Sequence, residues 1–424
     1  MKKHIVVMLG GYYPVISPGS MILDRLIDIW KKEYDVTIIS TRNVFGLKKI
    51  ETIDGINIHR VYDFNRLIHN ELENKIKNTT GLYKHFFKAC LRIKQVLFYI
   101  YRVFRLESID NNYVNRLKKE IKNINNNRKI DILISTVDPH ENSAAAYLYA
   151  KKNNVKWFIY QLDRFANANS LYETELTKKV KMSRHYKREC SYLEKCEKLF
   201  VLKPIMEHYR EHCFNEYLQK IIVTDHPLLC KPAIDVVGSG MMDSIRFIYA
   251  GSLDKKLRNP TNILKIFSIV YKKTSLKLDF FSFGNCSDIL EEYHNTNPTV
   301  IENHNRISRE GLVNEICRSD VIVSIGNNSD NEVPSKTFDY LSYGLPIVHF
   351  YSNPKDPVLE YMKIYPMAIC LYMGDESTDS NVKKLIDFCS SINKRKLDFK
   401  EVEALYPMCT PEFVSKMFTE EFNK

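Results

Sequence analysis

The sequence predicts an α/β fold with two Rossmann-like, doubly wound domains that face a cleft, followed by a C-terminal helix. Short β-branched apolar runs alternate with amphipathic segments along the whole chain, which is typical of βαβ units around a buried parallel sheet. A glycine turn follows the first apolar run of each half, at Gly10-Gly11 and again at Gly251-Ser252. With 424 residues, the chain is long enough for two domains that each bury a core.

In the first half, the apolar run at 4–9 is followed by a helix that opens at Pro18 and by further strands, expected at 35–40, 56–61, 130–136, 156–161, 199–202 and 221–223. The glycines of the first turn do not fit the spacing G-x-G-x-x-G, and no acidic residue follows the second strand. A dinucleotide site is therefore not expected. We place the N-terminal domain at 1–228.

The second half repeats this plan, with strands and helices expected at 246–250, 260–271, 276–283, 309–318 and 321–325. We place the C-terminal domain at 229–398. A helical segment at 399–424, whose last helix opens at Thr410-Pro411, is expected to pack back toward the N-terminal domain.

The most informative stretch runs from 331 to 348, directly after the buried-strand pattern of 320–325. Pro334 suits the first turn of a helix, Ser335 suits its N-cap, and Gly344 suits the left-handed position that ends it. A strand, a polar loop and a helix N-terminus make a natural anion site, because the first backbone N–H groups have no partner within the helix.

Charged side chains in this helix indicate the chemistry of a nucleotide-sugar. Lys336 adds a cation in the first turn, where a diphosphate would bind. Asp339 lies one turn later on nearly the same face, where its carboxylate can accept hydrogen bonds from ribose hydroxyls. The spacing alone fits an ordinary βα unit with a surface lysine equally well.

Polar residues also follow two neighbouring strands of the first half. Asp138, His140 and Glu141 lie in the loop after one expected strand, and Asp163 follows the next. Ligands of open α/β sheets bind at the carboxyl ends of the strands, so both loops are expected to point at a cleft. These four residues are candidate general bases, and the alternative for each is a loop cap or a surface residue.

Positive charge is concentrated in the first half of the chain. The net charge of the whole chain is +11, and residues 1–225 contribute 39 Lys and Arg against 25 Asp and Glu. This asymmetry predicts an anionic partner such as a membrane surface, a phosphorylated acceptor or nucleic acid, with a generally basic surface as the alternative. The sequence contains no recognition-helix or RNA-binding signature, so nucleic acid is not expected among the partners.

Residues 82–106 combine aromatic and aliphatic residues with Lys and Arg, and they contain no acidic residue. Such a basic amphipathic helix is typical of a segment that lies in an anionic membrane interface. The alternative is one or two helices that cover the N-terminal sheet, with the lysine stems lying over its apolar edge. Peripheral membrane contact through 82–106 is therefore one of two open readings.

The cysteines and the apolar runs indicate the compartment. The ten cysteines are scattered without a C-x-x-C pair, so a reducing cytosol is expected rather than a disulfide framework or a structural zinc site. The N-terminal apolar run has no cleavage site, and no apolar stretch reaches about 18 residues, so neither a signal peptide nor a transmembrane helix is expected. We expect a cytoplasmic protein, with the inner face of the cell membrane as a further location.

Residues 245–350 resemble the GT-B nucleotide-sugar glycosyltransferases, and among them glycosyltransferase family 4. The resemblance is carried, in this order along the chain, by Phe247 to Leu253 with Arg258-Asn259-Pro260, by Ser308 to Leu312 before Asp320, and by Val333 to Tyr340 with Gly344-Leu345-Pro346. It implies a donor site in the C-terminal domain and an acceptor site in the N-terminal domain.

The resemblance also implies roles for single residues. The donor-binding residues that it implies are Gly251, Ser252, Arg258, Arg306, Ser335, Lys336 and Asp339. Among these, the two cations Arg258 and Lys336 would contact the diphosphate, and the backbone at Gly251 would approach it closely. Asp339 would bind the ribose, and the segment around Arg306 would contact the base.

Two residues depart from the family pattern. The acidic pair of the family, which has seven residues between its members, would need an acid at Asn331, where Glu332 is the nearest one. The second acid is Asp339 rather than a glutamate, and its side chain is one methylene shorter. Contact between Glu332 and the transferred sugar therefore stays an open question at this point.

In such an enzyme, negative charge develops on the leaving diphosphate as the bond to the anomeric carbon breaks. Arg258, Lys336 and the amides of 335–337 are expected to stabilise that charge without a metal ion. The resemblance implies a hexosyltransferase that retains the anomeric configuration, in which the leaving phosphate can take the acceptor proton. Inversion would instead require a general base, for which the candidates are Asp138, His140, Glu141 and Asp163.

The expected function is transfer of a sugar from a UDP-sugar, or a GDP-sugar, to a glycan or polyprenyl-linked acceptor in bacterial surface polysaccharide (capsule) synthesis. No cofactor and no metal are expected besides the nucleotide-sugar co-substrate. The alternative is a non-catalytic or regulatory protein of the same fold that binds sugar-nucleotides, and the missing acid at Asn331 is its best support.

Overall fold

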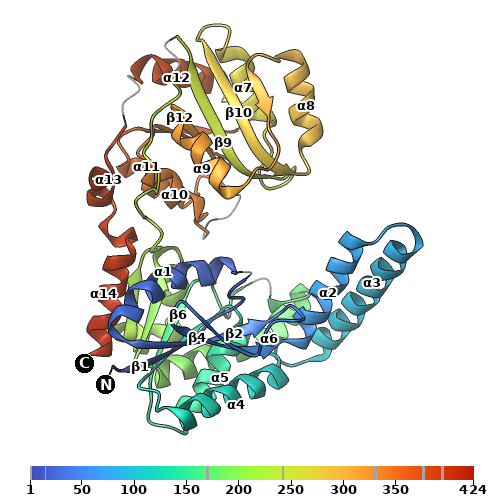
Figure 1. Cartoon of the computed structure of the whole chain (residues 1–424), viewed down its shortest axis with the longest axis vertical. Coiled ribbons are helices and arrows are strands. Elements are labelled where there is room, and N and C mark those ends of the chain that lie inside the picture. Colours follow the sequence, from blue (N-terminus) through green and yellow to red (C-terminus); the bar gives the residue numbers. More distant parts are fainter. Residues whose placement is uncertain are drawn as a thin grey trace. The chain divides into compact units, whose positions relative to one another are not determined.

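The computed structural model divides the chain into two compact units (Figure 1). The first unit comprises Met1–Pro227 with Pro411–Lys424, and the second comprises Leu228–Thr410. The structure describes residues 2–14, 16–168, 171–240, 243–327, 330, 332–374, 378–392 and 396–424. Each unit has its own largely parallel sheet covered by helices, so the predicted α/β class with two Rossmann-like domains is confirmed.

The sheet of the first unit has eight strands among the described residues, in the order β3-β4-β2-β1-β5-β6-β7-β8. Their bounds are β1 (His4–Met8), β2 (Asp35–Arg42), β3 (Ile50–Ile53), β4 (Ile56–Tyr62), β5 (Ile132–Thr136), β6 (Lys156–Gln161), β7 (Lys198–Leu202) and β8 (Ile221–Thr224). Every neighbouring pair is parallel except β3 and β4. The sequence reading did not include β3, which is a short edge strand that buries none of its residues.

Helices cover this sheet and extend beyond it. They are α1 (Pro18–Glu33), α2 (Phe64–Asn78), α3 (Gly81–Phe104), α4 (Asn111–Asn127), α5 (His140–Ala150), α6 (Glu175–Lys195), α14 (Pro411–Phe422) and the 3-10 helices η2 (Lys203–Arg210) and η3 (His212–Lys220). Helix α1 begins where expected, because the Ser17 side chain accepts a hydrogen bond from the Ser20 amide and Pro18 occupies the first turn.

The last helix, α14, completes the core of the first unit. The ring of Phe418 stacks on Phe200 of β7 with centroids 3.6 Å apart, and it lies 5.4 Å from the ring of Trp30 in α1. Helix α13 (Phe399–Leu405) instead belongs to the second unit, where the Tyr406 hydroxyl donates to the Tyr361 carbonyl. The segment expected at 399–424 is therefore divided between the two units, at Pro411.

The sheet of the second unit is entirely parallel, with the order β11-β10-β9-β12-β13-β14 among the described residues. The strands are β9 (Ile245–Leu253), β10 (Leu276–Gly284), β11 (Ile301–Asn303), β12 (Val321–Ile325), β13 (Ile347–Tyr351) and β14 (Ala368–Tyr372). The helices are α7 (Thr261–Val270), α8 (Ser287–Thr296), α9 (Arg309–Cys317), α10 (Lys336–Ser342), α11 (Val358–Ile364), α12 (Thr378–Ser391), α13 and the 3-10 helix η5 (Pro407–Cys409).

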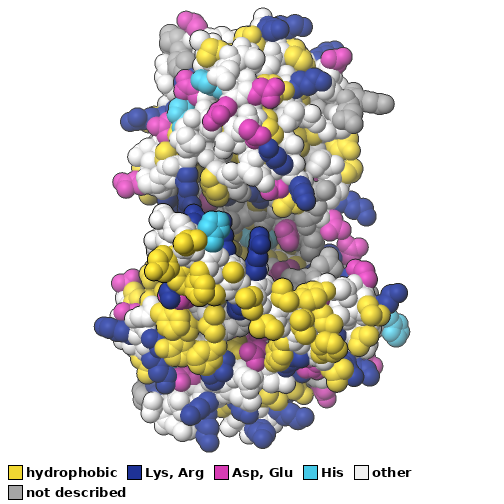
Figure 2. All heavy atoms as spheres, turned by 90° about the vertical axis from the view of Figure 1, so that its right-hand side faces the viewer, with side chains coloured by type: hydrophobic (Ala, Val, Ile, Leu, Met, Phe, Trp, Pro, Cys, Tyr) yellow, Lys and Arg dark blue, Asp and Glu magenta, His cyan; other side chains and the backbone are white. Residues whose placement is uncertain are grey.

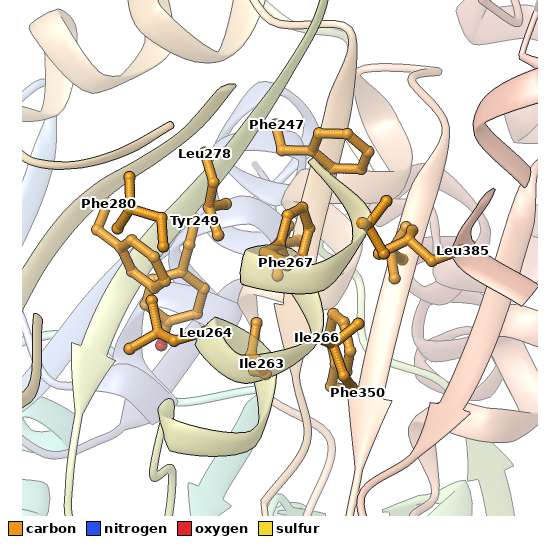
Figure 3. Packing of buried hydrophobic residues seen from close by; sticks show 14 of the residues in the cluster. Phe247, Tyr249, Ile263, Leu264, Ile266, Phe267, Leu278, Phe280, Phe350 and Leu385 are labelled. Atoms are coloured by element: carbon orange, nitrogen blue, oxygen red, sulfur yellow. The ribbon is translucent and has the colours of Figure 1, made fainter. Parts of the chain in front are cut away.

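One apolar cluster lies between this sheet and helices α7 and α12 (Figure 3). Phe267 of α7 is fully buried, and its ring lies 5.0 Å from that of Phe247 in β9. A second cluster on the other face includes Phe338 and Leu341 of α10 and Val402 of α13. Because both faces are covered, the strands read as continuous apolar runs rather than as alternating ones.

Both sheets reverse their strand order beside the first strand of the unit. In the second unit the chain moves outward from β9 through β10 and β11, and then returns to β12 on the other side of β9. In the first unit the corresponding reversal lies between β1 and β5. Ligands of open α/β sheets bind outside the carboxyl ends of the strands at such a switch point, so each unit has one expected binding position.

Candidate active site

The predicted donor-binding residues lie at the switch point of the second unit. Gly251 and Ser252 lie near the end of β9, and Arg258 follows in the loop before α7. Lys336 opens α10, which follows β12, the neighbour of β9 in the sheet. The structure brings these four residues together from two loops that are almost 80 positions apart in the sequence.

Gly251 lets Lys336 lie across the end of β9. The Lys336 ammonium donates a hydrogen bond of 3.0 Å to the carbonyl oxygen of Ala250, the residue before this glycine. A Cβ atom at position 251 would lie 3.0 Å from that ammonium nitrogen and 3.0 Å from the Tyr249 hydroxyl oxygen. Both approaches are tighter than ordinary van der Waals contact, so a side chain at position 251 would require Lys336 or Tyr249 to shift by a few tenths of an ångström.

Arg258, from the loop between β9 and α7, reaches the same end of β9 as Lys336 does. Its guanidinium donates to the Ser252 hydroxyl at 3.0 Å and to the side-chain oxygen of Asn327, beyond β12, at 2.8 Å. The loop that carries Arg258 is held by Asp254, whose carboxylate accepts the backbone amides of Lys256 and Leu257. Backbone bonds between Asp254 and Arg258 close this turn.

The charges in this site act on one another. Burial lowers the pKa of Lys336, the neighbouring Arg258 lowers it further, and Arg306 contributes in the same direction. Asp339 opposes these effects and raises that pKa. Three cations therefore act on one another in a region where Asp339 is the carboxylate that opposes them, and an anion placed among them would relieve their mutual repulsion.

The other predicted donor residues lie around this centre. Arg306, after β11, is exposed and its guanidinium carbon lies 5.0 Å from the centroid of the Phe283 ring at the end of β10. Asp339 is exposed on α10, and Glu332 is exposed in the loop before it. Asn331, which the family pattern singles out, lies outside the described residues.

The start of α10 differs from the sequence prediction. Ser335 stands at the N-cap position, but its backbone is already helical, with φ −54° and ψ −30°, and its side chain makes no capping hydrogen bond. The Thr337 amide instead donates to the carbonyl of Pro334 at 2.9 Å. Because α10 has only seven residues, the positive charge of this region comes from its side-chain cations rather than from a long helix dipole. Gly344 has φ +68° and ends the helix as predicted.

The switch point of the first unit lies between the glycine turn after β1 and the loop after β5. A Cβ atom at Gly10 would lie 3.0 Å from the Ser17 hydroxyl oxygen and 3.4 Å from the Asp138 carbonyl oxygen. The Thr136 hydroxyl, at the end of β5, donates to that same Asp138 carbonyl at 3.0 Å. The absence of a side chain at Gly10 thus allows the two loops to lie against each other.

Three of the four candidate bases of the first unit, Asp138, His140 and Asp163, have different surroundings. Asp138 is half exposed, and its carboxylate lies 3.7 Å from the guanidinium of Arg66. Burial lowers the pKa of His140 to about 3, with a further contribution from His185, so its imidazole is neutral at physiological pH. Asp163 is exposed beyond β6, the next strand of the sheet, and its carboxylate accepts the Arg164 amide at 2.7 Å.

Glu141, also weighed as a base, is bound to the backbone. Its carboxylate accepts the Asp110 amide at 2.8 Å and thereby links the start of α5 to the start of α4. Burial raises the pKa of this carboxyl. The contact indicates a positioning role for Glu141, while Asp138 keeps a side chain that solvent and a substrate can reach.

Sequence reasoning missed the buried carboxylate of Glu189 in α6. Glu189 accepts hydrogen bonds from the Tyr209 hydroxyl at 2.6 Å, from the Gln161 side chain at 3.2 Å and from the Ala166 amide at 3.3 Å, and His208 lies 3.0 Å away. These contacts hold the loop after β6, which carries Asp163. A charged helix shows no pattern that marks one of its acids as buried, so only the tertiary structure reveals this residue.

Sequence reasoning also missed a basic cavity between α2 and α3. It has a volume of about 340 Å³, and its charged lining residues are Arg66, His69, Lys94, Arg102 and Glu173. Glu173 is already paired with Arg102 at 2.6 Å and with the buried Lys181 at 2.9 Å. Burial lowers the pKa of Lys94, and none of the described carboxylates forms an ion pair with it. Because Arg66 also approaches Asp138, the cavity lies beside the candidate base.

Comparison with known proteins identifies the fold. No protein family and no curated protein matches the chain at the level of sequence. Among solved structures it is similar to sucrose-phosphate synthase from Thermosynechococcus elongatus, with 9% identity and a TM-score of 0.63 over 100% of this chain and 98% of that one. It is similar to the lipopolysaccharide outer core galactosyltransferase WaaB, with 13% identity and a TM-score of 0.55 over 98% of both chains.

A third similar structure is UDP-GlcNAc 2-epimerase from Methanocaldococcus jannaschii, with 12% identity and a TM-score of 0.53 over 98% of this chain and 99% of that one. The chain therefore has the GT-B fold, as the resemblance implied. Since this fold occurs in transferases and in an epimerase, the chemistry must be argued from the residues of the site.

Proposed function

We propose that this protein is a glycosyltransferase that moves a hexose from a UDP-sugar, or a GDP-sugar, to a glycan or lipid-linked acceptor. The observation that carries the proposal is the joint placement of Arg258 and Lys336 at the end of β9, where Gly251 leaves room beside the backbone. The proposal is further supported by the GT-B fold, in which two of the similar structures are named as a synthase and a galactosyltransferase.

The two cations have a defined role in this reaction. The bond between the anomeric carbon and the diphosphate oxygen breaks, and the electron pair of that bond stays on the diphosphate. Arg258 and Lys336 stabilise the developing charge at a partly buried position, where an electrostatic contact is stronger than in water. Loss of one such contact costs about 2–4 kcal/mol of transition-state stabilisation. This chemistry is assigned to side chains, and no metal ion is part of the proposal.

The remaining donor contacts follow from the arrangement around this centre. Asp339 is exposed on the same helix as Lys336, and we assign its carboxylate to the ribose hydroxyls. Arg306 acts electrostatically on Lys336 and lies over the Phe283 ring, and we assign this pair to the base. Glu332 is assigned to the transferred sugar, because it is exposed in the loop between β12 and α10.

The acceptor hydroxyl must lose a proton when its oxygen bonds to the anomeric carbon. In a retaining reaction, which we propose here, the leaving phosphate takes that proton. Of the protein groups, Asp138 is the best placed to assist, since it lies at the switch point of the first unit with its side chain half exposed. His140 is a poor base near neutral pH because its pKa is about 3.

The basic cavity between α2 and α3 favours an acceptor that carries phosphate. The one acid of its lining, Glu173, pairs with Arg102 and Lys181, while Arg66 pairs with Asp63 and Asp138, so Lys94 is the lining cation without a paired carboxylate among the described residues. A polyprenyl-linked acceptor has a diphosphate that suits such a site. We therefore place the enzyme in the cytoplasm, in the synthesis of a bacterial surface polysaccharide such as a capsule.

Two successive experiments test the proposal: binding of UDP to the protein, and then release of UDP from a UDP-sugar. The full chain is expected to be stabilised against heat by UDP, and the variant Lys336→Ala to lose most of that gain, while the exposed control Lys400→Ala keeps it. A UDP-sugar with crude lipid-linked acceptor is then expected to release UDP, with kcat/KM about 10²–10³ lower for Lys336→Ala.

Other outcomes separate the alternatives. Stabilisation by UDP without release of UDP from any acceptor mixture supports the non-catalytic sugar-nucleotide-binding protein. Conversion of the donor sugar to an epimer, with the nucleotide still attached, supports an epimerase. Stabilisation by NAD and not by UDP or GDP excludes the donor site itself.

A further inference from the structure

Helix α3 exposes an apolar stripe along its whole length. The helix has 24 residues, and none of them is buried. Leu82, Phe86, Ile93, Leu97, Ile100 and Phe104 follow one another at intervals of three, four or seven residues, so they lie on one side of the helix. Their exposed fractions run from 46% for Ile100 to 87% for Leu82. We call these six residues the α3 stripe.

The stripe does not serve to cover the sheet of the first unit. Figure 1 shows α2 and α3 side by side in a helical hairpin that extends away from the sheet. The face of α3 that lines the cavity toward α2 carries Lys94, Phe98 and Arg102, and these residues lie on the side opposite to the stripe. Packing within the hairpin therefore leaves the stripe open to solvent.

Figure 2 shows the face of the first unit on which apolar side chains gather into a broad patch with few charged side chains within it. Exposed apolar residues of a neighbouring helix extend the set, since Leu176 and Val180 of α6 are 72% and 54% exposed. Helices α3 and α6 are tied together, because the Lys181 ammonium donates to the Arg102 carbonyl at 2.6 Å. Exposed apolar patches of this kind mark contact with a membrane or another protein.

The charge of helix α3 indicates which kind of partner binds the α3 stripe. Helix α3 contains no acidic residue, and of its cations Lys94 and Arg102 face α2, whereas Lys88 and Arg92 are exposed to solvent. Two copies of such a helix would repel each other if their stripes met, so a symmetric dimer through α3 is disfavoured. An anionic bilayer satisfies both features, since the acyl chains accept the apolar side chains and the lipid headgroups pair with the cations.

We propose that α3 is a monolayer anchor, which lies in the plane of an anionic membrane with the α3 stripe facing the acyl chains. At 1.5 Å per residue the helix is about 36 Å long, so the stripe reaches several lipid headgroups at once. No helix among the described residues is long and apolar enough to cross a bilayer, which leaves a surface position for this one. The proposal concerns a surface of the first unit and does not rest on the proposed function.

Vesicle sedimentation with the full chain tests the anchor. Vesicles of phosphatidylglycerol and phosphatidylcholine are expected to bind the protein, and vesicles of phosphatidylcholine alone to bind it at least tenfold more weakly. The variant Leu97→Glu/Phe104→Glu is expected to lose binding to the anionic vesicles. The matched control Ile364→Glu changes a residue of the second unit that is 51% exposed, and it is expected to bind as the unchanged protein does.

The cations are tested separately. Lys88→Ala and Arg92→Ala replace exposed residues of α3, and each is expected to lower the partition coefficient about fivefold at low salt. Because all substituted residues are exposed, each variant should keep the thermal midpoint of the parent, which separates loss of binding from loss of folding.

Three outcomes would overturn the proposal. One is equal binding to anionic and neutral vesicles. Another is a dimer in solution that Leu97→Glu/Phe104→Glu dissociates, which would assign the stripe to a second copy of the chain. The third is a parent protein that neither sediments with vesicles nor changes its oligomeric state, which would leave the stripe without the occupant proposed for it.

Discussion

The ammonium nitrogen of Lys336 lies 3.0 Å from the carbonyl oxygen of Ala250, and also 3.0 Å from the position that a Cβ atom at Gly251 would take. This relationship connects two segments that the sequence shows only as separate signals, a glycine turn and a lysine at a helix start. The position of the lysine side chain therefore depends on the glycine, and this dependence can be tested directly.

The substitution Gly251→Ala is expected to displace Lys336. The new Cβ atom would lie 3.0 Å from the lysine nitrogen. The Tyr249 hydroxyl, at the same distance from that Cβ atom, leaves the Cβ atom little room to move away from the lysine. We expect the affinity for UDP to fall about tenfold, which corresponds to about 1.4 kcal/mol. Isothermal calorimetry of the single variants and of Gly251→Ala/Lys336→Ala gives the coupling. Additive losses would show that the glycine acts independently of the lysine.

The affinity for UDP is expected to fall as the pH rises. We expect this fall to begin at a lower pH than it would if Lys336 had the pKa of an ordinary lysine. Burial and Arg258 lower the pKa of Lys336 below 10.5, so the free protein loses this charge early as the pH rises. A bound diphosphate favours the charged form, and binding therefore takes up a proton in that range. Calorimetry between pH 7.5 and 10 measures the decline.

The variant Lys336→Arg is the control for this pH dependence, because a guanidinium keeps its charge throughout the range. Its affinity, even if weaker, is expected to stay level where that of the parent falls. A decline of equal steepness in both proteins would assign the titration to another group.

The substitution His140→Phe is expected to reduce the loss of stability in mild acid. The folded protein lowers the pKa of His140 from 6.5 to about 3, so the unfolded chain binds more protons between these values. Stability associated with this residue is therefore present above pH 6.5 and is lost as the pH falls toward 3. Thermal midpoints at pH 7.5 and pH 5 should differ less in the variant than in the parent, whereas His212→Phe, at an exposed site, should leave the difference unchanged.

The substitution Glu189→Gln is expected to destabilise the first unit by about 2–4 kcal/mol. It replaces a buried carboxylate that accepts three hydrogen bonds, and the new amide would place donors against the Tyr209 hydroxyl or the Ala166 amide. Urea denaturation monitored by tryptophan fluorescence checks this, since Trp30 and Trp157 both belong to the first unit. Glu194→Gln, an exposed residue of the same helix, should change the midpoint little. Equal effects would show that the hydrogen bonds of Glu189 contribute nothing specific.

The sequence predicted those features that depend on local patterns. Buried parallel strands appear as continuous apolar runs, so the strands that flank the donor site, β9 and β12, were found together with the turn at Gly251. Gly344 was found because a left-handed residue is a strong local signal for a helix end. The expected cleft between the domains concerns their relative placement, and it stays a prediction.

Features that depend on distant contacts were not predictable in the same way. Ser335 has the residue type of a cap, but the local backbone makes a turn through Pro334 instead. The burial of Glu189 depends on partners from β6, its loop and η2, which no local window contains. The cavity beside Lys94 is lined by residues of α2 and α3 and by Glu173, which are separated in the sequence. The net charge of its lining could therefore not be predicted from a local stretch of sequence.

The packing of Phe418 against Phe200 and Trp30 has a consequence for biosynthesis. Residues that emerge first from the ribosome form a sheet whose hydrophobic interior stays unfinished until the segment from Pro411 to Phe422 is made. The first unit must therefore wait, partly open, while the whole second unit is synthesised and can fold. A nascent chain arrested before Pro411 should accordingly be sensitive to proteases in its first unit and resistant in its second.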